Sequence, residues 1–450
     1  MKVAVIGLGK LGSSISAVIA SKKIFVRGHD IDKEKVIDFN RGKPPVFENS
    51  LDNLFKKNKK YISAYKNVDE AIKFCSIIFI TVPTPSEANG CFSLKYAKDA
   101  FLKIALSIKN NKNYHLIVFN STVLPGSTRS VLVNLFEKIS NKKLNKDFGV
   151  CYNPAFIALG SVVKDFSNPD FVLIGESDKK AGDLLKKFYL KILKRKILFK
   201  TMSIENAELA KIALNAYITT KITFANMLSK IAEKIPSGNI DTITKAIGMD
   251  KRIGEKYLSA GLGYGGPCFP RDNIALDYFA KKIKVNFSIS KLVHNFNDKI
   301  ANNVILNFMK DVSKNKTIAV LGISYKTGSN ILDESQGFLI AKLLSKRFKK
   351  VLCYDPMASK IDSINFSDNM ELTNNLHKSV ANSSVIIIAN RDKRYSLINS
   401  KNLRNKRIID CWRLLNSKVY KKDYFSLGVD ENFAINKKNL ERIWKQYKNN

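Results

Sequence analysis

The glycine-rich segment GLGYGGPCFPRD, at residues 261–272, contains a thiol and a carboxyl group that could carry out covalent chemistry. Cys268 follows four glycines, which let the backbone approach a ligand closely, and Asp272 stands four residues later near the start of an expected helix. Backbone N–H groups at that position favour a thiolate, and a thiolate can attack an aldehyde. The competing interpretation is a small, inert packing residue, the usual role of a free cysteine.

A lysine and an asparagine on one helix could stabilise the charge that such chemistry develops. Lys211 and Asn215 are four residues apart, so they share one face of the long helix expected from residue 203 to about 234. Ammonium and amide groups are donors for an alkoxide or oxyanion. The competing interpretation is a solvated helix face, but residues 212–214 and 216 are apolar.

The segment NSTVLPG, residues 120–126, adds a hydroxyl group at the end of an expected strand. Thr122 could hold a water or a carboxylate there, or it could simply cap the turn after the strand. The predicted catalytic residues are therefore Cys268, Lys211, Asn215, Asp272 and Thr122.

Three glycines near the N-terminus predict a dinucleotide site. Gly7, Gly9 and Gly12 form a GxGxxG between an apolar strand at residues 2–6 and a helix, and Asp30 ends the next strand. This context permits a tight turn, close approach of a pyrophosphate to the backbone, and a helix N-terminus that faces negative charge. Asp30 is expected to bind the ribose hydroxyls and to repel a 2′-phosphate, which favours NAD over NADP. Glycines that serve only a tight turn are the alternative.

The elements that must position these residues repeat along the chain. Apolar runs at residues 76–83, 115–122 and 170–175 alternate with helical patterns, as in a buried parallel sheet. The series of strand, glycine turn and helix is repeated from TIAVLGISYKTG onward. In this repeat Asp355 ends the second strand, as Asp30 does in the first series. The predicted fold is α/β, with two Rossmann-like doubly wound domains joined by a helical central domain with one long helix.

The predicted domain boundaries follow from this repeat. An NAD-binding Rossmann domain is expected at residues 1–195 and a helical central domain, which contains the long helix, at 196–310. A C-terminal Rossmann-like domain is expected at 311–430, and residues 431–450 look like an exposed or frayed basic tail. Few glycines remain in the second glycine turn, so a second dinucleotide there is improbable.

Composition excludes several classes of function. The formal charge of +37 invites a nucleic-acid interpretation, but the lysines are spread over all 450 residues without a recognisable binding motif. A solvated basic surface fits better, and it would attract an anionic substrate. The six scattered cysteines form no metal-binding pattern, so no metal is expected. With no apolar run long enough for a membrane span and no signal peptide, we expect a cytoplasmic protein with no membrane span.

In order and over nearly the whole chain, these segments resemble the UDP-glucose/GDP-mannose dehydrogenase family. The matching stretches are VAVIGLGKLG, TVPTP, STVLPG, NPAF…NPDFVLIG, AELAKIALNAY, RIGEKYLSAGLGYGGPCFPRD, VLGISYKTG and IIDCWR. The resemblance implies that NAD takes a hydride from C6 of a nucleoside-diphosphate hexose and that Cys268 captures the aldehyde as a thiohemiacetal. A second NAD then gives a thioester, which water hydrolyses, so two NAD are used per sugar.

The resemblance also assigns roles to individual residues. It implies that Lys211 and Asn215 stabilise oxyanions, that Asp272 assists proton transfer and that Thr122 positions water. Arg252 would reach substrate, in its own or a neighbouring subunit, and the long helix would build a homodimer. The expected cofactor-binding residues are Gly7, Gly9, Lys10, Leu11, Gly12, Asp30, Lys33, Val82, Pro83, Thr84, Ser121, Thr122 and Arg271. The expected substrate-binding residues are Phe156, Lys211, Asn215, Arg252, Tyr257, Tyr264, Gly265, Cys268, Tyr325, Lys326 and Arg413.

Three positions depart from the family pattern. Ala155 in NPAF stands where the family usually has a glutamate, and Leu159 stands where another acidic residue is common. The missing glutamate is commonly the base for thioester hydrolysis, so the rate or route of that step is in question. Asp333 replaces an arginine of many members, which could alter the preference for sugar or nucleotide.

UDP-glucose is the favoured substrate, with a UDP-N-acetylhexosamine or GDP-mannose as alternatives. A binding homologue that turns over poorly for lack of the glutamate is a second hypothesis. The presence of Cys268, Lys211, Asn215 and Asp272 argues against it. A member of the wider hydroxyacid dehydrogenase group is a third, disfavoured by the second Rossmann-like domain and the cysteine. A nucleic-acid-binding protein comes last.

Overall fold

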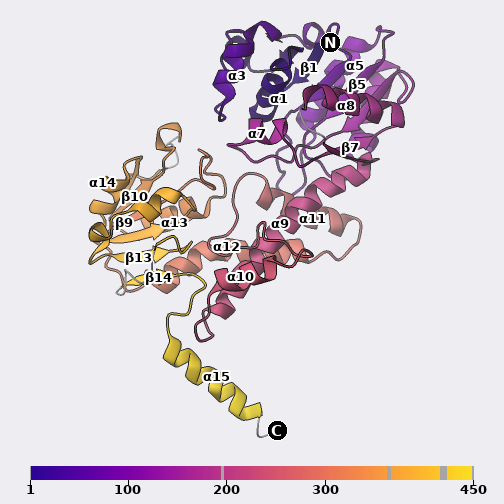
Figure 1. Cartoon of the computed structure of the whole chain (residues 1–450). Helices are drawn as coiled ribbons and strands as arrows, with labels where there is room; N and C mark the ends of the chain where they lie inside the picture. The colour runs from indigo at the N-terminus through magenta and orange to yellow at the C-terminus, as the bar shows by residue number, and fades with distance from the viewer. Residues whose placement is uncertain (1, 194–196, 362–365, 416–422, 448–450) are drawn as a thin grey trace. The chain divides into compact units, whose positions relative to one another are not determined.

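The computed structural model describes residues 2–193, 197–361, 366–415 and 423–447 (Figure 1). The chain divides into two compact units, Met1–Leu214 and Asn215–Asn450, called unit 1 and unit 2 below. Residues 215–310 of the predicted helical domain and the second sheet thus belong to one unit, while the predicted boundaries at residues 195, 310 and 430 stay predictions. No helix of the described segments combines the length and apolarity needed to cross a bilayer.

Unit 1 is built on an eight-stranded sheet in the order β3-β2-β1-β4-β5-β6-β7-β8. Its strands are β1 (Lys2–Ile6), β2 (Phe25–His29), β3 (Ile62–Tyr65), β4 (Ile77–Ile80), β5 (His115–Phe119), β6 (Phe148–Tyr152), β7 (Phe171–Glu176) and β8 (Leu198–Ser203). The strands predicted at residues 2–6, 76–83, 115–122 and 170–175 are confirmed, whereas β3, β6 and β8 were not predicted.

The first sheet departs from the expected parallel arrangement at one place, because β7 runs antiparallel to β6, with Tyr152 opposite Gly175. Parallel neighbours need a crossover connection, usually a helix that returns the chain along the sheet. The connection here, residues 153–170, contains the short helix α7 (Val162–Ser167), which packs against α1. This helix has only six residues, and the chain enters β7 in the opposite direction to β6.

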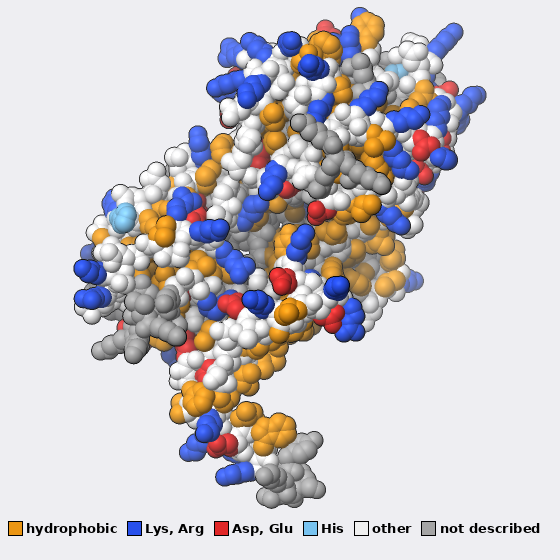
Figure 2. Space-filling view, viewed as in Figure 1, with side chains coloured by type: hydrophobic (Ala, Val, Ile, Leu, Met, Phe, Trp, Pro, Cys, Tyr) orange, Lys and Arg blue, Asp and Glu red, His pale blue; other side chains and the backbone are white. Residues whose placement is uncertain are grey.

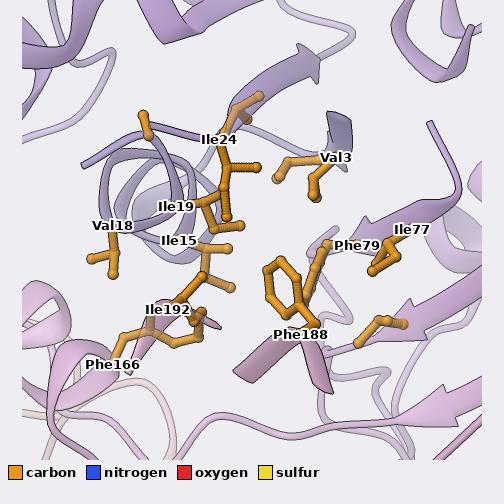
Figure 3. Close-up of a cluster of buried hydrophobic side chains, with 14 of the residues drawn as sticks. Val3, Ile15, Val18, Ile19, Ile24, Ile77, Phe79, Phe166, Phe188 and Ile192 are labelled. Atoms are coloured by element: carbon orange, nitrogen blue, oxygen red, sulfur yellow. The ribbon is translucent and has the colours of Figure 1, made fainter. Parts of the chain in front are cut away.

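Both faces of the first sheet are buried. Alternate residues of β1 contribute to two different apolar clusters, Val3 and Val5 to one and Ala4 and Ile6 to the other. Figure 3 shows the first cluster, in which Ile15 and Ile19 of α1 lie with Phe79 of the sheet and Phe188 of α8. The helices of unit 1 are α1 (Lys10–Ala20), α2 (Lys33–Asn40), α3 (Leu51–Asn58), α4 (Val68–Ile72), α5 (Lys95–Ile108), α6 (Asn134–Ser140), α7 and α8 (Lys179–Ile192), with a 3₁₀ turn η1 (Lys59–Tyr61) and a π-helix η2 (Ser127–Val133).

One long helix, α9 (Ile204–Ala232), begins in unit 1 and ends in unit 2. The helix predicted for residues 203 to about 234 is therefore confirmed. Lys211 and Asn215 lie on this helix one turn apart.

Unit 2 continues with helices and a six-stranded sheet in the order β11-β10-β9-β12-β13-β14, whose described strand pairs are parallel. Its helices are α10 (Ile240–Gly248), α11 (Phe269–Lys282), α12 (Ile289–Phe308), α13 (Gln336–Ser345), α14 (Leu376–Ala381) and α15 (Phe433–Tyr447), with 3₁₀ turns η3 (Ala358–Lys360), η4 (Lys393–Leu397) and η5 (Ser400–Leu403). Its strands are β9 (Thr317–Leu321), β10 (Lys350–Tyr354), β11 (Met370–Thr373), β12 (Val385–Ile388), β13 (Arg407–Asp410) and β14 (Tyr424–Ser426). The predicted second strand, glycine turn and helix are confirmed, but the edge strands β11 and β14 were not predicted.

The C-terminal residues differ from the expected frayed tail, because residues 433–447 form α15 (Figure 1). Asn436 anchors the first turn: its side chain is buried and donates to the carbonyl of Glu233 at 3.0 Å and to Asp430 at 2.7 Å. Most of the remaining described side chains of α15 are exposed, in agreement with the other half of that expectation.

Elsewhere, Lys and Arg side chains are scattered over the face shown in Figure 2 and form no single basic patch there.

Candidate active site

The turn after β1 can accept a phosphate group because its glycines let the backbone pack closely. Gly7 has φ +97°, and a Cβ on Gly12 would lie 1.9 Å from the carbonyl oxygen of Gly7. Helix α1 begins one residue after Gly9. Gly9 is the N-cap residue, and since it has no side chain, no side-chain cap occupies the N–H groups of the first turn. A helix N-terminus of this kind attracts anions. The turn therefore fits the pyrophosphate of a dinucleotide.

Asp30 is held in place at the end of β2. It accepts hydrogen bonds from the backbone N–H of Leu8 at 2.7 Å and of Asp32 at 3.0 Å, one on each carboxylate oxygen. The Lys35 ammonium lies 3.9 Å from one of these oxygens. These two backbone bonds fix the orientation of the carboxylate, as a preorganised binding group requires.

A cavity of about 550 Å³ opens next to this turn. The predicted residues that line it are Gly7, Gly9, Lys10, Leu11, Asp30, Val82 and Pro83. Lining residues that sequence reasoning missed are His29, Asp32, Lys35, Tyr96, Asp99 and Lys103, among others. Burial lowers the pKa of His29, whose Nδ1 lies 3.1 Å from the carbonyl of Tyr65. The lining residues on α5 could have been predicted, because α5 is the helix that follows β4 and ligands bind beyond the carboxyl ends of parallel strands.

Other predicted cofactor residues do not line the cavity. Gly12 packs against the turn itself, and Lys33 is exposed at the start of α2. Ser121 and Thr84 instead join two strand-end loops: Ser121 Oγ donates to the carbonyl of Val82 at 2.5 Å, and Thr84 Oγ1 donates to the carbonyl of Thr122 at 2.7 Å. These two bonds fix the backbone that carries the Thr122 side chain.

Lys211 is a nearly buried cation, with 8% of its surface exposed. Its Nζ donates to the carbonyl of Ala155 at 3.0 Å and lies 4.8 Å from the centre of the Phe156 ring. A carbonyl and an aromatic face both compensate for lost hydration of an ammonium. The structure thus brings the predicted lysine, the predicted Phe156 and the departure at Ala155 together in unit 1.

In unit 2, the cysteine and its predicted partners lie at the start of α11. Cys268 is exposed and is the N-cap residue, and its carbonyl accepts from the backbone N–H of Asp272 at 2.9 Å. Asp272 is only 1% exposed and accepts from Asn215 Nδ2 at 2.6 Å. Arg271 Nε lies 3.6 Å from the other carboxylate oxygen. A thiol at a helix N-terminus, one turn from a buried carboxylate–amide pair, is an arrangement suited to covalent capture of a carbonyl group.

The glycines before Cys268 are required by close packing inside unit 2. A Cβ on Gly266, which has φ +85°, would lie 2.7 Å from the Tyr325 ring, and one on Gly265 would lie 2.3 Å from the carbonyl oxygen of Glu334. The Gly266 N–H donates to the carbonyl of Asp333 at 2.9 Å. The predicted Tyr325 and Gly265, and the departure at Asp333, therefore meet where the loop after β9 contacts the cysteine segment.

Comparison with known proteins agrees with this geometry. The NAD binding domain of the UDP-glucose/GDP-mannose dehydrogenase family matches residues 1–193, its central domain matches 205–299, and its UDP binding domain matches 319–417. The UDP-glucose 6-dehydrogenase of Rickettsia felis is 31% identical over 448 residues, which cover 95% of this chain and 96% of that protein. The chain belongs to this family.

Two further relatives of the UDP-glucose/GDP-mannose dehydrogenase family are similar over most of their length. The GDP-mannose 6-dehydrogenase of Pseudomonas savastanoi pv. phaseolicola is 30% identical over 426 residues, covering 91% of this chain and 95% of that protein. A solved UDP-glucose dehydrogenase from Pyrobaculum islandicum has a TM-score of 0.86 at 27% identity, covering 94% of this chain and 96% of that one. As a family member, the protein is an NAD-dependent nucleotide-sugar 6-dehydrogenase.

Not every residue that the family resemblance assigned to substrate faces open space. Arg413 is 7% exposed and binds Asp241 through two bonds of 2.6 and 2.8 Å, together with the carbonyls of Leu427 and Ala260, each at 2.7 Å. It thereby joins the helical part of unit 2 to the second sheet. Tyr264 is also buried, and burial raises its pKa. The substrate-binding roles of both stay predictions.

The remaining predicted residues are more accessible. Arg252 and Tyr257 are exposed, and the Arg252 guanidinium pairs with Asp250 at 2.6 Å. Lys326 is half-buried in the loop after β9.

Sequence reasoning missed Arg391, just after β12. Its guanidinium lies 5.0 Å from the centre of the Trp412 ring and donates to Ser259 at 3.1 Å. The segment NRDKR directly follows a parallel strand, and this position could have pointed to Arg391 in the sequence. Within the described ranges, no cluster of three or more His, Cys, Asp or Glu could hold a metal ion.

Proposed function

We propose that the protein oxidises the C6 hydroxyl of UDP-glucose to a carboxylate, giving UDP-glucuronate, and uses two NAD per sugar. The observation that carries the proposal is the exposed thiol of Cys268 at the N-terminus of α11, one turn before the buried Asp272–Asn215 pair. The similarity to UDP-glucose 6-dehydrogenases supports UDP-glucose, and the similarity to a GDP-mannose 6-dehydrogenase keeps GDP-mannose as the alternative.

Each predicted residue has a step to perform. NAD, when bound, supplies the hydride acceptor for both oxidations. The Lys211 ammonium and the Asn215 amide donate to the oxygen at C6 as negative charge develops on it. The Cys268 sulfur bonds to the aldehyde carbon and gives a thiohemiacetal, which the second oxidation converts to a thioester. Water then adds to the thioester carbon, and the thiolate leaves as the carboxylate forms.

Hydrolysis is the step that the departures affect. Ala155 offers a backbone carbonyl, already bonded to Lys211, where relatives of the family usually have a carboxylate. We infer that Asp272 accepts the proton of the attacking water and that Thr122 helps to position that water. The burial of Asp272 and its bond to Asn215 support a fixed carboxylate in this role.

We infer that α9 forms a homodimer. Its C-terminal half exposes Tyr217, Phe224, Met227 and Ile231 at spacings of seven, three and four residues, so they lie along one face. An apolar stripe of this kind, exposed in a single chain, marks an interaction surface. The exposed Arg252 of unit 2 is then able to reach the substrate of the neighbouring subunit.

We further infer a division of labour among the segments. Residues 1–195 bind NAD, residues 196–310 form the dimer, and residues 311–430 bind the nucleotide sugar. All six cysteines belong to the described part of the chain and none forms a disulfide, which supports a cytoplasmic location.

The stoichiometry of NADH release tests the proposal. Purified protein is given UDP-glucose, GDP-mannose or a UDP-N-acetylhexosamine, and NADH released per sugar consumed is measured. About two NADH per UDP-glucose are expected, and Cys268→Ala is expected to form no sugar acid because it cannot form the thioester. Turnover that stops after about two NADH per enzyme molecule, with thioester accumulating, would show that the loss of the acid at position 155 impairs hydrolysis. No turnover on any sugar would favour a binding homologue, and wild-type yield from Cys268→Ala would exclude the covalent route.

A further inference from the structure

A buried carboxylate connects the catalytic helix to the Thr122 loop, and none of the proposed catalytic steps uses it. Glu208 lies on α9 one turn before Lys211 and has no exposed surface. One carboxylate oxygen accepts from the backbone N–H of Gly126 at 2.6 Å, and the other accepts from that of Thr128 at 2.9 Å. Both donors belong to the start of the π-helix η2, so the carboxylate also faces its positive end.

These bonds hold the far end of the loop that carries Thr122. The near end is held by the bonds from Ser121 to Val82 and from Thr84 to the Thr122 carbonyl. Thr122 therefore lies between two anchors, one at the edge of the cofactor cavity and one on α9. The helix that provides the second anchor is the one that carries Lys211.

The anchor is chemically costly, which argues against a passive role. Burial raises the pKa of Glu208 to about 7, even though backbone N–H donors favour its charged form. Neutral side chains cap helices without that cost. Glu205, one turn earlier on α9, offers a contrast: its carboxylate pairs with Arg129 of the same η2 helix at 2.8 Å, near the surface.

We propose that Glu208 is a positioning residue for the oxidation and hydrolysis steps, because its two backbone bonds fix the Thr122 loop relative to Lys211. This inference rests on the proposed roles of Thr122 and Lys211. A misplacement of about 1 Å at a reacting group can cost roughly a hundredfold in rate. A carboxylate bonded to two N–H groups constrains the loop more strongly than one neutral hydrogen bond does.

A variant pair on α9 tests the inference. Glu208→Gln keeps the size of the side chain, but its NH2 group cannot accept from the second N–H. We expect kcat to fall by about tenfold or more while the Kd for NAD stays within about twofold, since the cavity-side bonds remain. The matched control Glu205→Gln removes a surface contact to the same η2 helix and is expected to leave both quantities within about twofold.

A double-mutant cycle separates positioning from general destabilisation. If Glu208 acts through the loop, adding Glu208→Gln to Thr122→Ala should lower kcat by no more than about twofold further. Full additivity of the two losses would overturn the proposal. So would an unchanged kcat in Glu208→Gln alone, provided Thr122→Ala is impaired. Should Thr122→Ala prove fully active, the proposed role of Thr122 would fail instead.

Hydrogen exchange gives a readout that does not depend on turnover. Amides of residues 120–133 should exchange faster in Glu208→Gln than in the wild type or in Glu205→Gln, by about tenfold. If Glu208→Gln does not fold, Glu208→Asp replaces it, because the shorter side chain keeps the charge but cannot reach both donors. Unchanged exchange in a folded variant would overturn the anchoring itself.

Discussion

The chain contains two strand–turn–aspartate motifs, one in unit 1 and one in unit 2, that share a backbone scaffold. They differ in the loop and the helix that follow the scaffold. In unit 1 the Gly7 N–H donates to the His29 carbonyl and the Leu8 N–H donates to Asp30. In unit 2 the Gly322 N–H donates to the Tyr354 carbonyl at 2.8 Å, and the Ser324 N–H donates to Asp355 at 2.9 Å. Each aspartate also accepts from the backbone N–H two residues later.

The difference lies in the distance to the next helix. Helix α1 begins three residues after Gly7, whereas α13 does not begin until Gln336. The intervening loop brings Tyr325 and Asp333 against the glycines before Cys268. The same backbone scaffold therefore leaves a helix N-terminus beside a cavity in unit 1 and supports the cysteine segment in unit 2. The length of the connection to the next helix therefore determines whether a Rossmann-like motif exposes a helix N-terminus or packs a loop against another segment.

Alanine at the helix glycine that packs against the first glycine of each turn should produce the largest effect. A Cβ would lie 1.9 Å from a carbonyl oxygen in Gly12→Ala and 2.3 Å in Gly337→Ala, so each should lower the free energy of unfolding by about 3 kcal/mol or more. Urea unfolding followed by circular dichroism measures this. Gly9→Ala is the control, since no atom lies within 4 Å of its Cβ position. A stable Gly12→Ala would mean that the two turns do not share the packing described.

Buried carboxyl groups in the two units should respond to pH in the same direction. Burial raises the pKa of Glu208 to about 7 and also raises that of Asp355. A raised carboxyl pKa favours folding while the group is protonated, so its contribution is lost as pH rises through the range between the unfolded and folded pKa values. For Glu208 the loss is roughly 3 kcal/mol at most between pH 4.5 and 7. Thermal unfolding at several pH values should show a flatter profile in Glu208→Gln, and an unchanged slope would contradict this assignment.

The paired substitutions Asp30→Ala and Asp355→Ala should separate the functions of the two scaffolds. Loss of Asp30 removes a charged acceptor at the cofactor cavity, so the KM for NAD should rise by about thirtyfold and discrimination against NADP should weaken. Loss of Asp355 frees the Ser324 N–H and should raise the KM for the nucleotide sugar while the KM for NAD stays constant. Initial rates with each cofactor measure both. A large rise in the KM for NAD in Asp355→Ala would show that the scaffolds are not independent.

The smallest effect is expected from Lys35→Gln. The ammonium is partly exposed and lies 3.9 Å from Asp30, whose carboxylate already has two backbone donors. Such pairs contribute little, so the KM for NAD should change by less than about threefold, and less still at high salt. A tenfold rise would mean that Lys35 contacts the cofactor directly.

Local patterns predicted the central strands well, apart from β6, and the edge strands poorly. Runs such as residues 76–83 and 115–122 are apolar on both faces, which identifies buried parallel strands. The missed strand β8 includes exposed and half-buried residues, and β11 and β14 have four and three residues, so neither hydrophobicity nor length distinguished them from loops. The reversal between β6 and β7 depends on the path of residues 153–170 across α1, and no local spacing records that path.

The candidate site shows the same division. Gly7, Asp30 and Cys268 could be found because their chemistry depends on backbone turns and helix starts that the sequence marks. The bonds made by Arg413 and the ties to Glu208 join segments far apart in the chain, so only the folded arrangement reveals them. Substrate binding by Arg252 and Lys326 stays a prediction.

The burial of the thiols has a practical consequence for chemical labelling. Cys268 is exposed, whereas Cys75, Cys151, Cys353 and Cys411 are buried and Cys91 is half-buried. Burial raises the pKa of Cys75 to about 11 and that of Cys353 to about 12, which keeps both protonated at neutral pH. A brief exposure to an alkylating reagent should therefore modify Cys268 first. The folded protein thus offers one preferred attachment point for a fluorophore, at the atom where the sugar would be captured.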